Sequence, residues 1–204
     1  MSRFLAALAL CLCLLGAEPL SARVLGDAAI AYSAERVLTV NGQSFIGRIY
    51  SIPGHQRHEQ AVAGFQQVAI FDLVAGRGYF ILPALMSYVD FRIAGALAEL
   101  SAPDITGAPA GTETVGGIAT ARYNIRKRAS DGTLIEGTIW LSSAGIPMRA
   151  DGAVIDGSGI RTAFSWQLSH VRVGAQDPAM FSAPVGLYRL PEAALPGFLG
   201  GQGG

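Results

Sequence analysis

Histidine is the side chain best suited to acid–base or metal chemistry near neutral pH, and the chain has three histidines. His55 and His58 have a metal-like spacing only on a helix. Pro53-Gly54 and the pattern that follows predict extended chain, in which residues three apart face opposite sides of a sheet. We therefore predict no metal site. At His170 the apolar pattern of a strand shifts by one residue, which favours a bulge and a hydrogen-bonded structural histidine.

Motifs for nucleophilic catalysis are missing from the sequence. Gly42-Gln43-Ser44 begins like a nucleophile elbow, but Ile46 stands where the second glycine belongs. Asp151-Gly152 and Asp156-Gly157 lack the spaced carboxylates of a calcium loop and read as turns. We expect a protein that is not an enzyme and that uses no cofactor. A Ser/His/Asp triad assembled from distant residues is the least favoured hypothesis.

One basic cluster is present, at Arg122, Arg126, Lys127 and Arg128. Strand alternation places Arg122 and Arg126 on one face, so Arg122, Arg126 and Arg128 are candidates for a patch that binds an anionic group or a partner. The alternative is an ordinary solvated face. The whole chain has 15 basic and 15 acidic residues and a net charge of zero, so we exclude nucleic acid as a partner.

The first 22 residues have the features of a signal peptide. Arg3 is followed by an apolar run from Phe4 to Leu15, which is too short for a comfortable membrane span, and small residues precede a predicted cleavage after Ala22. Both cysteines, Cys11 and Cys13, lie in this run. The mature chain then has no disulfide or thiolate metal site, and we expect a periplasmic protein.

The mature chain reads as short strands separated by glycine-containing turns, of which Asn41-Gly42 is the strongest hairpin signal. Predicted strands cover residues 31–40, 45–50, 57–62, 67–73, 79–83, 119–126, 134–141, 146–150 and 164–169, with an edge strand or extended lead-in at 85–89. Asp90 is predicted to cap a short helix over 91–100. These elements predict a mainly β (α+β) domain, a curved antiparallel half-barrel of eight or more strands whose concave face is covered by the helix.

We assign residues 23–190 to this single domain and 191–204 to a disordered glycine-rich tail. Half of the residues are hydrophobic and only 15% are charged, which indicates a large core, a cavity or an apolar surface for a partner. The residues predicted to line an apolar cavity and its lid are Phe45, Tyr50, Phe80, Phe91, Ile93, Leu97, Tyr123, Trp140, Phe164 and Trp166.

Several short segments together resemble a known family: Tyr32-Ser33-Ala34-Glu35-Arg36, Tyr79-Phe80-Ile81-Leu82-Pro83, Glu136-Gly137-Thr138-Ile139-Trp140 and Gly145-Ile146-Pro147-Met148-Arg149. They resemble uncharacterised periplasmic proteins similar to the outer-membrane lipoprotein carrier (LolA/LolB-like) superfamily. The resemblance implies a half-barrel wrapped around helices, with a concavity that shields acyl chains.

The resulting expectation is a periplasmic carrier or binding protein for a lipid, an acyl chain or another apolar ligand, including a lipidated protein, in lipoprotein or envelope biogenesis. Such a protein also contacts membranes peripherally. The alternative is an envelope interaction or sensor module with a filled interior that docks a protein partner.

Overall fold

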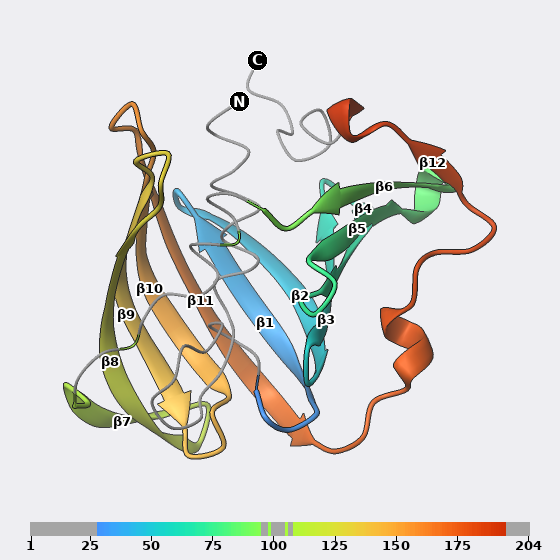
Figure 1. Ribbon diagram of the computed structural model, residues 1–204. Helices are drawn as coiled ribbons and strands as arrows, with labels where there is room; N and C mark the ends of the chain where they lie inside the picture. The colour runs from blue at the N-terminus through green and yellow to red at the C-terminus, as the bar shows by residue number, and fades with distance from the viewer. Residues whose placement is uncertain (1–27, 95–97, 99–104, 106–107, 195–204) are drawn as a thin grey trace.

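The computed structural model describes residues 28–94, 98, 105 and 108–194, which form one open β-sheet (Figure 1). Its twelve strands have the order β12-β6-β5-β4-β3-β2-β1-β11-β10-β9-β8-β7. Neighbouring strands are antiparallel, except that β12 runs parallel to β6. The sheet curls so that β8–β10 and β3–β6 stand as two walls on either side of β1 and β2. This confirms the predicted curved sheet of eight or more strands.

The strands on one side of β1 begin with its own hairpin partner. On that side, β1 (Tyr32–Val40) is followed by β2 (Gln43–Ile52), β3 (His55–Val62), β4 (Phe65–Asp72), β5 (Arg77–Leu82), β6 (Ser87–Arg92) and β12 (Tyr188–Leu190). On the other side are β7 (Gly111–Val115), β8 (Ile118–Arg128), β9 (Leu134–Ser142), β10 (Pro147–Ile155) and β11 (Arg161–Val173). Three short 3-10 helices in the described part of the chain are η1 (Pro83–Leu85), η2 (Pro178–Phe181) and η3 (Glu192–Ala194).

The predicted hairpin at Asn41-Gly42 joins β1 to β2 and also anchors β11. Asn41 and Gly42 have φ angles of 49° and 84°, the left-handed pair that a tight two-residue turn requires. The Asn41 side-chain oxygen accepts a hydrogen bond of 3.0 Å from the backbone N–H of Ala163. The turn therefore holds the central strands of the sheet together.

The predicted irregularity at His170 is a β-bulge in β11. Ser33 pairs with Arg172 and Glu35 with Ser169, so one extra residue of β11 lies opposite Ala34. His170 has a φ of 51°, and its Nδ1 lies 3.0 Å from the Glu35 carboxylate. The bulge bends β11 and aims the exposed imidazole at the neighbouring strand.

The helix predicted over 91–100 does not begin where the sequence suggested. Asp90 and Phe91 belong to β6, where Ser87, Val89 and Phe91 are buried and the residues between them are not. The sequence predicted Asp90 as a helix cap and Phe91 as the first helical residue, but both continue the alternation of β6, which has the period of a strand. Residues 95–97 and 99–100 lie outside the described residues, so a helix over the concave face stays a prediction.

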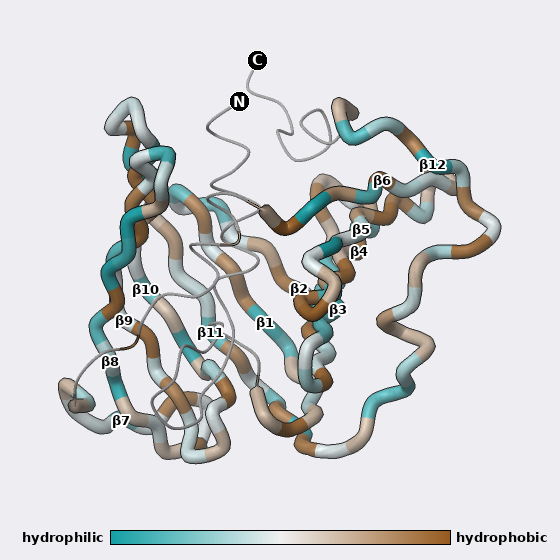
Figure 2. Tube along the Cα trace, in the orientation of Figure 1, coloured by the Kyte–Doolittle hydropathy of each residue, from teal (hydrophilic) through white to brown (hydrophobic). Residues whose placement is uncertain are grey.

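The two faces of the sheet differ in character along β1. Tyr32, Ala34, Arg36 and Leu38 are buried on the concave face, whereas the alternate residues of β1 are partly or fully exposed on the convex face. Figure 2 shows the corresponding alternation of apolar and polar residues along the central strands. The main apolar core lies on the concave face of β1, β2 and β8–β11, and Ile105 from the connection between β6 and β7 packs against it.

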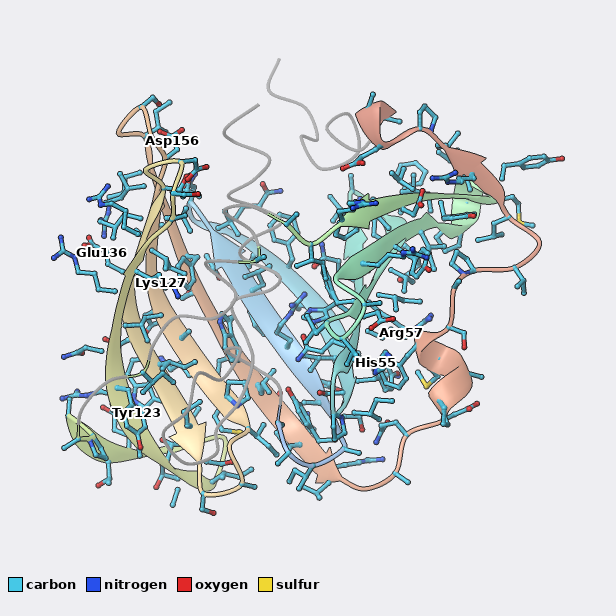
Figure 3. All side chains as sticks on the ribbon, in the orientation of Figure 1. His55, Arg57, Tyr123, Lys127, Glu136 and Asp156 are labelled. Atoms are coloured by element: carbon cyan, nitrogen blue, oxygen red, sulfur yellow. The ribbon has the colours of Figure 1, made fainter. Side chains whose placement is uncertain are left out.

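The convex face of β3–β5 is covered by the chain that follows β11. The Phe181 ring packs edge-on against His55, and Arg57 donates a hydrogen bond to the Met180 carbonyl oxygen at 3.1 Å. Figure 3 shows His55 and Arg57 pointing toward this segment. Arg189 then forms two hydrogen bonds with Asp90, at 2.6 and 2.8 Å, which fasten β12 to β6.

The remaining predictions from the sequence concern the two ends of the chain. Residues 1–27, with the predicted signal peptide, and 195–204, with most of the predicted tail, lie outside the described residues. Among the helices that the structure describes, none is long and apolar enough to cross a membrane.

Candidate functional site

A cluster of buried polar side chains interrupts the apolar concave face at β1, β2 and β3. Arg36 and Gln56 are each 1% exposed, His58 is 2% exposed and Ser51 is fully buried. Strand register places these residues on the same face, because Ile49 pairs with His58 and Ser51 with Gln56. Buried polar groups are costly, so such a cluster in a core of this size needs a structural or functional explanation.

The position of Gly47 lets Arg36 reach across β2. Arg36 pairs with Gly47, and Gly47 pairs in turn with Gln60 of β3. The Arg36 Nη2 donates a hydrogen bond of 3.2 Å to Gln60 Oε1, so its side chain spans the place where a β2 side chain would stand. A Cβ at Gly47 would also overlap the backbone oxygen of Glu59. Only glycine fits this crossing.

Hydrogen bonds fix the protonation state of His58. The Arg36 Nη1 lies 2.6 Å from His58 Nδ1, and because a guanidinium has no acceptor, Nδ1 must be the unprotonated nitrogen. His58 Nε2–H then donates to Gln56 Oε1 at 2.9 Å. Burial, together with the charge of Arg36, holds the pKa of His58 well below its usual range. His58 is therefore neutral, and Arg36 is the charged member of the pair.

Three polar atoms of the cluster are buried without a hydrogen-bond partner among the described residues: Arg36 Nε, the Tyr32 hydroxyl and the Ser51 hydroxyl. Tyr32 and Ser51 face each other across β1 and β2. Burial raises the pKa of Tyr32 above its usual value, and the nearby Ser51 hydroxyl and Arg36 charge oppose this shift. Ser51 is thus close to Tyr32, but the two hydroxyls do not complete a hydrogen bond of ordinary geometry.

The charge of Arg36 is also uncompensated within the described part of the chain, where it forms no ion pair with a carboxylate. Its partners are the neutral His58 ring and the Gln60 amide. Burying a cation without a counter-ion costs several kcal/mol even after the surroundings relax. The fold tolerates this cost at one particular point of its concave face.

Beside the cluster, an apolar row crosses six strands in register from β2 to β8. Leu38 pairs with Phe45 and Trp166, Ala150 pairs with Trp166 and Ile139, and Ile139 pairs with Tyr123. Trp166 is 2% exposed, and its indole N–H has no partner in the described part of the protein. The apolar row lies next to the polar cluster, because Leu38 of the row and Arg36 of the cluster are consecutive concave positions of β1.

The structure divides the predicted cavity residues between the two faces. The strand residues on the concave face are Phe45, Phe80, Phe91, Tyr123, Phe164 and Trp166. Ile93 follows β6 and packs against the cluster that contains Phe91. Leu97 lies outside the described residues. Tyr50 and Trp140 are on the convex face. Tyr50 lies five positions after Phe45 and Trp140 lies one position after Ile139, and residues an odd number of positions apart in a strand face opposite sides.

Trp140 is buried on the convex face by an arginine stack. It pairs with Arg149 on one side and Arg122 on the other, and the Arg149 guanidinium lies 4.5 Å from the indole centroid. Such stacking both covers the ring and holds the cation. The two tryptophans of the chain therefore report on opposite faces of the sheet.

The arginines of the predicted basic patch lie on the convex face of β8, where each has a local partner. Arg122 donates to the Ala110 carbonyl oxygen at 3.0 Å, and Arg128 donates to that of Gly132 at 2.8 Å. Arg126 is mostly exposed and lies 3.9 Å from Glu136, which points away from the curled sheet in Figure 3. A patch for an anionic group or a partner stays a prediction.

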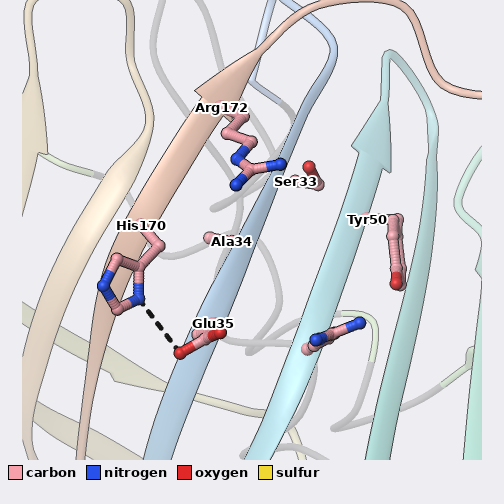
Figure 4. Close-up of a pocket in the computed structure, with 7 residues that line it drawn as sticks. Ser33, Ala34, Glu35, Tyr50, His170 and Arg172 are labelled. Carbon is pink, nitrogen blue, oxygen red and sulfur yellow. Dashed lines mark hydrogen bonds and ion pairs between the residues drawn. The ribbon is translucent and has the colours of Figure 1, made fainter.

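A shallow pocket of about 360 Å³ lies on the convex face over β1, β2 and β11 (Figure 4). Tyr50, Glu35, His170 and Arg172 line it, with the Glu35–His170 contact at its edge. Its charged groups are of both signs and are exposed to solvent. The pocket therefore lacks the buried, uncompensated charge that distinguishes the concave cluster.

The sequence did not single out Arg36 or His58 as site residues, although a signal was available. Arg36 is in phase with Tyr32, Ala34 and Leu38, which places it among residues that face the core. His58 was correctly separated from His55, since the two lie on opposite faces of β3. The pairing of β1, β2 and β3 brings these side chains together, and this pairing cannot be read from the spacing of residues in the sequence.

No protein family and no curated protein matches the chain at the level of sequence. Among solved structures, an uncharacterised conserved protein from Thermus thermophilus is 12% identical, with 83% of this chain and 94% of that chain covered and a TM-score of 0.54. MucB is 14% identical, with 79% and 60% covered and a TM-score of 0.50, so this chain spans about 60% of the MucB chain. MucB has also been solved in complex with MucA(peri).

A LolA superfamily protein from Nitrosomonas europaea is also similar, at 10% identity, with 78% of this chain and 96% of that chain covered and a TM-score of 0.41. The chain thus shares its fold with the Thermus protein and with MucB.

Proposed function

We propose that the chain is a periplasmic binding protein that holds an acyl chain or another apolar ligand against the concave face of its sheet. The observation that carries this proposal is the row of apolar residues that pair across neighbouring strands, from Phe45 through Trp166 to Tyr123. Apolar lining with a few placed polar groups is the usual composition of a small-molecule site. The adjoining buried cluster supplies such polar groups.

The proposed location in the periplasm rests on the sequence. Arg3, the apolar run that follows it and the small residues before Arg23 have the organisation of a cleavable signal peptide. Export would deliver the domain to a compartment where lipids and lipidated proteins need shielding from water. The low charged fraction of 15% fits such a role.

Native mass spectrometry of the protein purified from its own envelope tests this proposal. We expect a bound species of lipid mass that is lost on mild activation. The matched control is Ile46→Asn, which alters an apolar side chain that is 73% exposed on the convex face and should leave the bound species in place. Repeated isolation of ligand-free protein, together with no binding of a fluorescent lipid, would overturn the proposal.

A second candidate function is an envelope module that docks a protein partner. It is favoured by the likeness in fold to MucB, which has been solved with MucA(peri). In this case the interior is filled by the protein's own side chains, and a surface patch carries the interaction. In-cell cross-linking from Arg126, which is exposed on the convex face, would then capture one envelope protein reproducibly.

A further inference from the structure

We infer that the ligand of the concave face carries an oxyanion, a carboxylate or a phosphate monoester, which pairs with Arg36 while its acyl chain lies along the apolar row. This inference rests on the proposed function and specifies the ligand class. It makes Arg36 the residue that selects an anionic amphiphile over a neutral one.

The first argument is the unbalanced charge. Arg36 is 1% exposed, and its partners His58 and Gln60 are both neutral acceptors. Within the part of the chain that the structure describes, no carboxylate pairs with it. A guanidinium matches the geometry of carboxylate and phosphate oxygens, and an ion pair formed away from water is stronger than one at the surface.

The second argument is the set of donors that no described residue uses. Arg36 Nε–H is available to donate, and so are the hydroxyls of Tyr32 and Ser51. Tyr32 and Ser51 form a cross-strand pair on the same face as Arg36, and Tyr32 is close enough for the Arg36 charge to oppose the rise in pKa that burial of the phenol causes. All three atoms can donate to an oxygen that only accepts. An oxyanion has several lone pairs and no donor, so it is the kind of group that such donors would bind.

The third argument is the direction of the apolar lining. Leu38 follows Arg36 on the concave side of β1, and from Leu38 the row continues through Trp166 and Ile139 to Tyr123. A ligand with its charged end at Arg36 can therefore lay a hydrocarbon tail across β11, β10 and β9. A headgroup and a tail at opposite ends of one molecule fit this arrangement.

The test compares the binding of palmitate, hexadecyl phosphate and the methyl ester of palmitate to the full chain by isothermal titration. We expect the two anions to bind at least about tenfold more tightly than the ester, the gain typical of a buried charge-assisted contact. Arg36→Met should remove this preference by weakening the anions about tenfold while leaving the ester unchanged. Arg48→Met, which removes an exposed cation from the convex face of β2, is the matched control and should change nothing.

The outcomes separate the two proposals. Equal binding of anions and ester would overturn the oxyanion inference and leave the apolar-ligand proposal standing. Binding of none of the three probes would overturn both. If Arg36→Met does not fold, Tyr32→Phe and Arg36→Lys replace it: we expect the anions to weaken several-fold with Tyr32→Phe and to retain part of their preference with Arg36→Lys. An undiminished preference for the anions in both Tyr32→Phe and Arg36→Lys would overturn a donor cluster built around the guanidinium.

Discussion

The guanidinium of Arg36 in β1 donates a hydrogen bond of 2.6 Å to Nδ1 of His58 in β3. The two residues are separated by the whole of β2, and they meet because Gly47 leaves the intervening concave position empty. The contact joins a permanent cation to a histidine that must stay neutral. It is the centre of the polar cluster, and several expected outcomes follow from it.

Arg36→Met should leave the free energy of unfolding within about 1 kcal/mol of wild type, or raise it. The reason is that replacing a buried, uncompensated charge by an apolar side chain removes a desolvation cost that offsets the lost hydrogen bonds. Urea unfolding measures this. Leu38→Ala, at the next concave position of β1, is the comparison and should cost about 2 to 5 kcal/mol. A loss of that size for Arg36→Met would mean that the arginine serves the fold.

His58 should make stability fall with decreasing pH. Its pKa is lowered in the folded state, so below its ordinary value of 6.5 the unfolded chain binds a proton that the folded chain does not. Stability is then full above about pH 6.5 and declines by up to about 1.4 kcal/mol per pH unit as the pH falls toward the folded pKa. Urea midpoints measured from pH 7.5 to 5 test this.

Two variants isolate the contribution of His58 to this slope. His58→Asn keeps an acceptor for Arg36 but cannot take up a proton, so it should flatten the slope. Ile46→Asn, on the exposed convex face of β2, changes no titratable group and should leave the slope intact. If His58→Asn keeps the full slope, the pH dependence arises from other groups.

Gly47→Ala should be far more damaging than an alanine at an open glycine. A Cβ at Gly47 would overlap the Glu59 backbone oxygen and press on Gln60, so β2 and β3 must separate. We expect a loss of about 3 kcal/mol or more. Gly64→Ala, at a turn where nothing lies within 4 Å, should cost only the roughly 1–2 kcal/mol of its left-handed backbone. Similar thermal midpoints for the two variants would contradict the crowded crossing.

Ile93→Asn tests whether the chain after β6 forms a lid. Ile93 is only partly buried against the cluster that contains Phe71 and Phe91. If it contacts the ligand, this change should weaken lipid uptake while costing less than the roughly 2 to 5 kcal/mol of a packed core truncation. Paired measurements of urea midpoint and fluorescent-lipid binding decide the point. A large fall in midpoint, with lipid binding intact in the folded fraction, would place Ile93 in permanent core.

The sheet could be predicted from local signals because turns and alternation are local properties. Asn41-Gly42 and the phase shift at His170 each specified a backbone geometry that the structure confirms. The start of the helix was wrong because Asp90 is a common helix cap and Phe91 fits a helical pattern when read over a short segment, whereas pairing with β5 extends β6 through Arg92.

The site was harder to predict than the strands. The predicted cavity lining grouped the aromatic residues by residue type alone. Alternation along a strand places Phe45 and Tyr50 on opposite faces of the sheet, and likewise Ile139 and Trp140. The cluster of Arg36 and His58 depends on pairing between β1, β2 and β3, and no spacing within one strand reveals that a glycine will lie between them.

The two tryptophans allow the most direct test of ligand binding on the concave face. Trp166 lies in the apolar row, and Trp140 lies under Arg149 on the convex face. Trp140→Phe and Trp166→Phe each leave one reporter, and a brominated fatty acid quenches only indoles that its chain contacts. We predict strong, saturable quenching of Trp166 in Trp140→Phe and little change of Trp140 in Trp166→Phe. Quenching of Trp140 with Trp166 unaffected would place the ligand on the convex face and contradict the account.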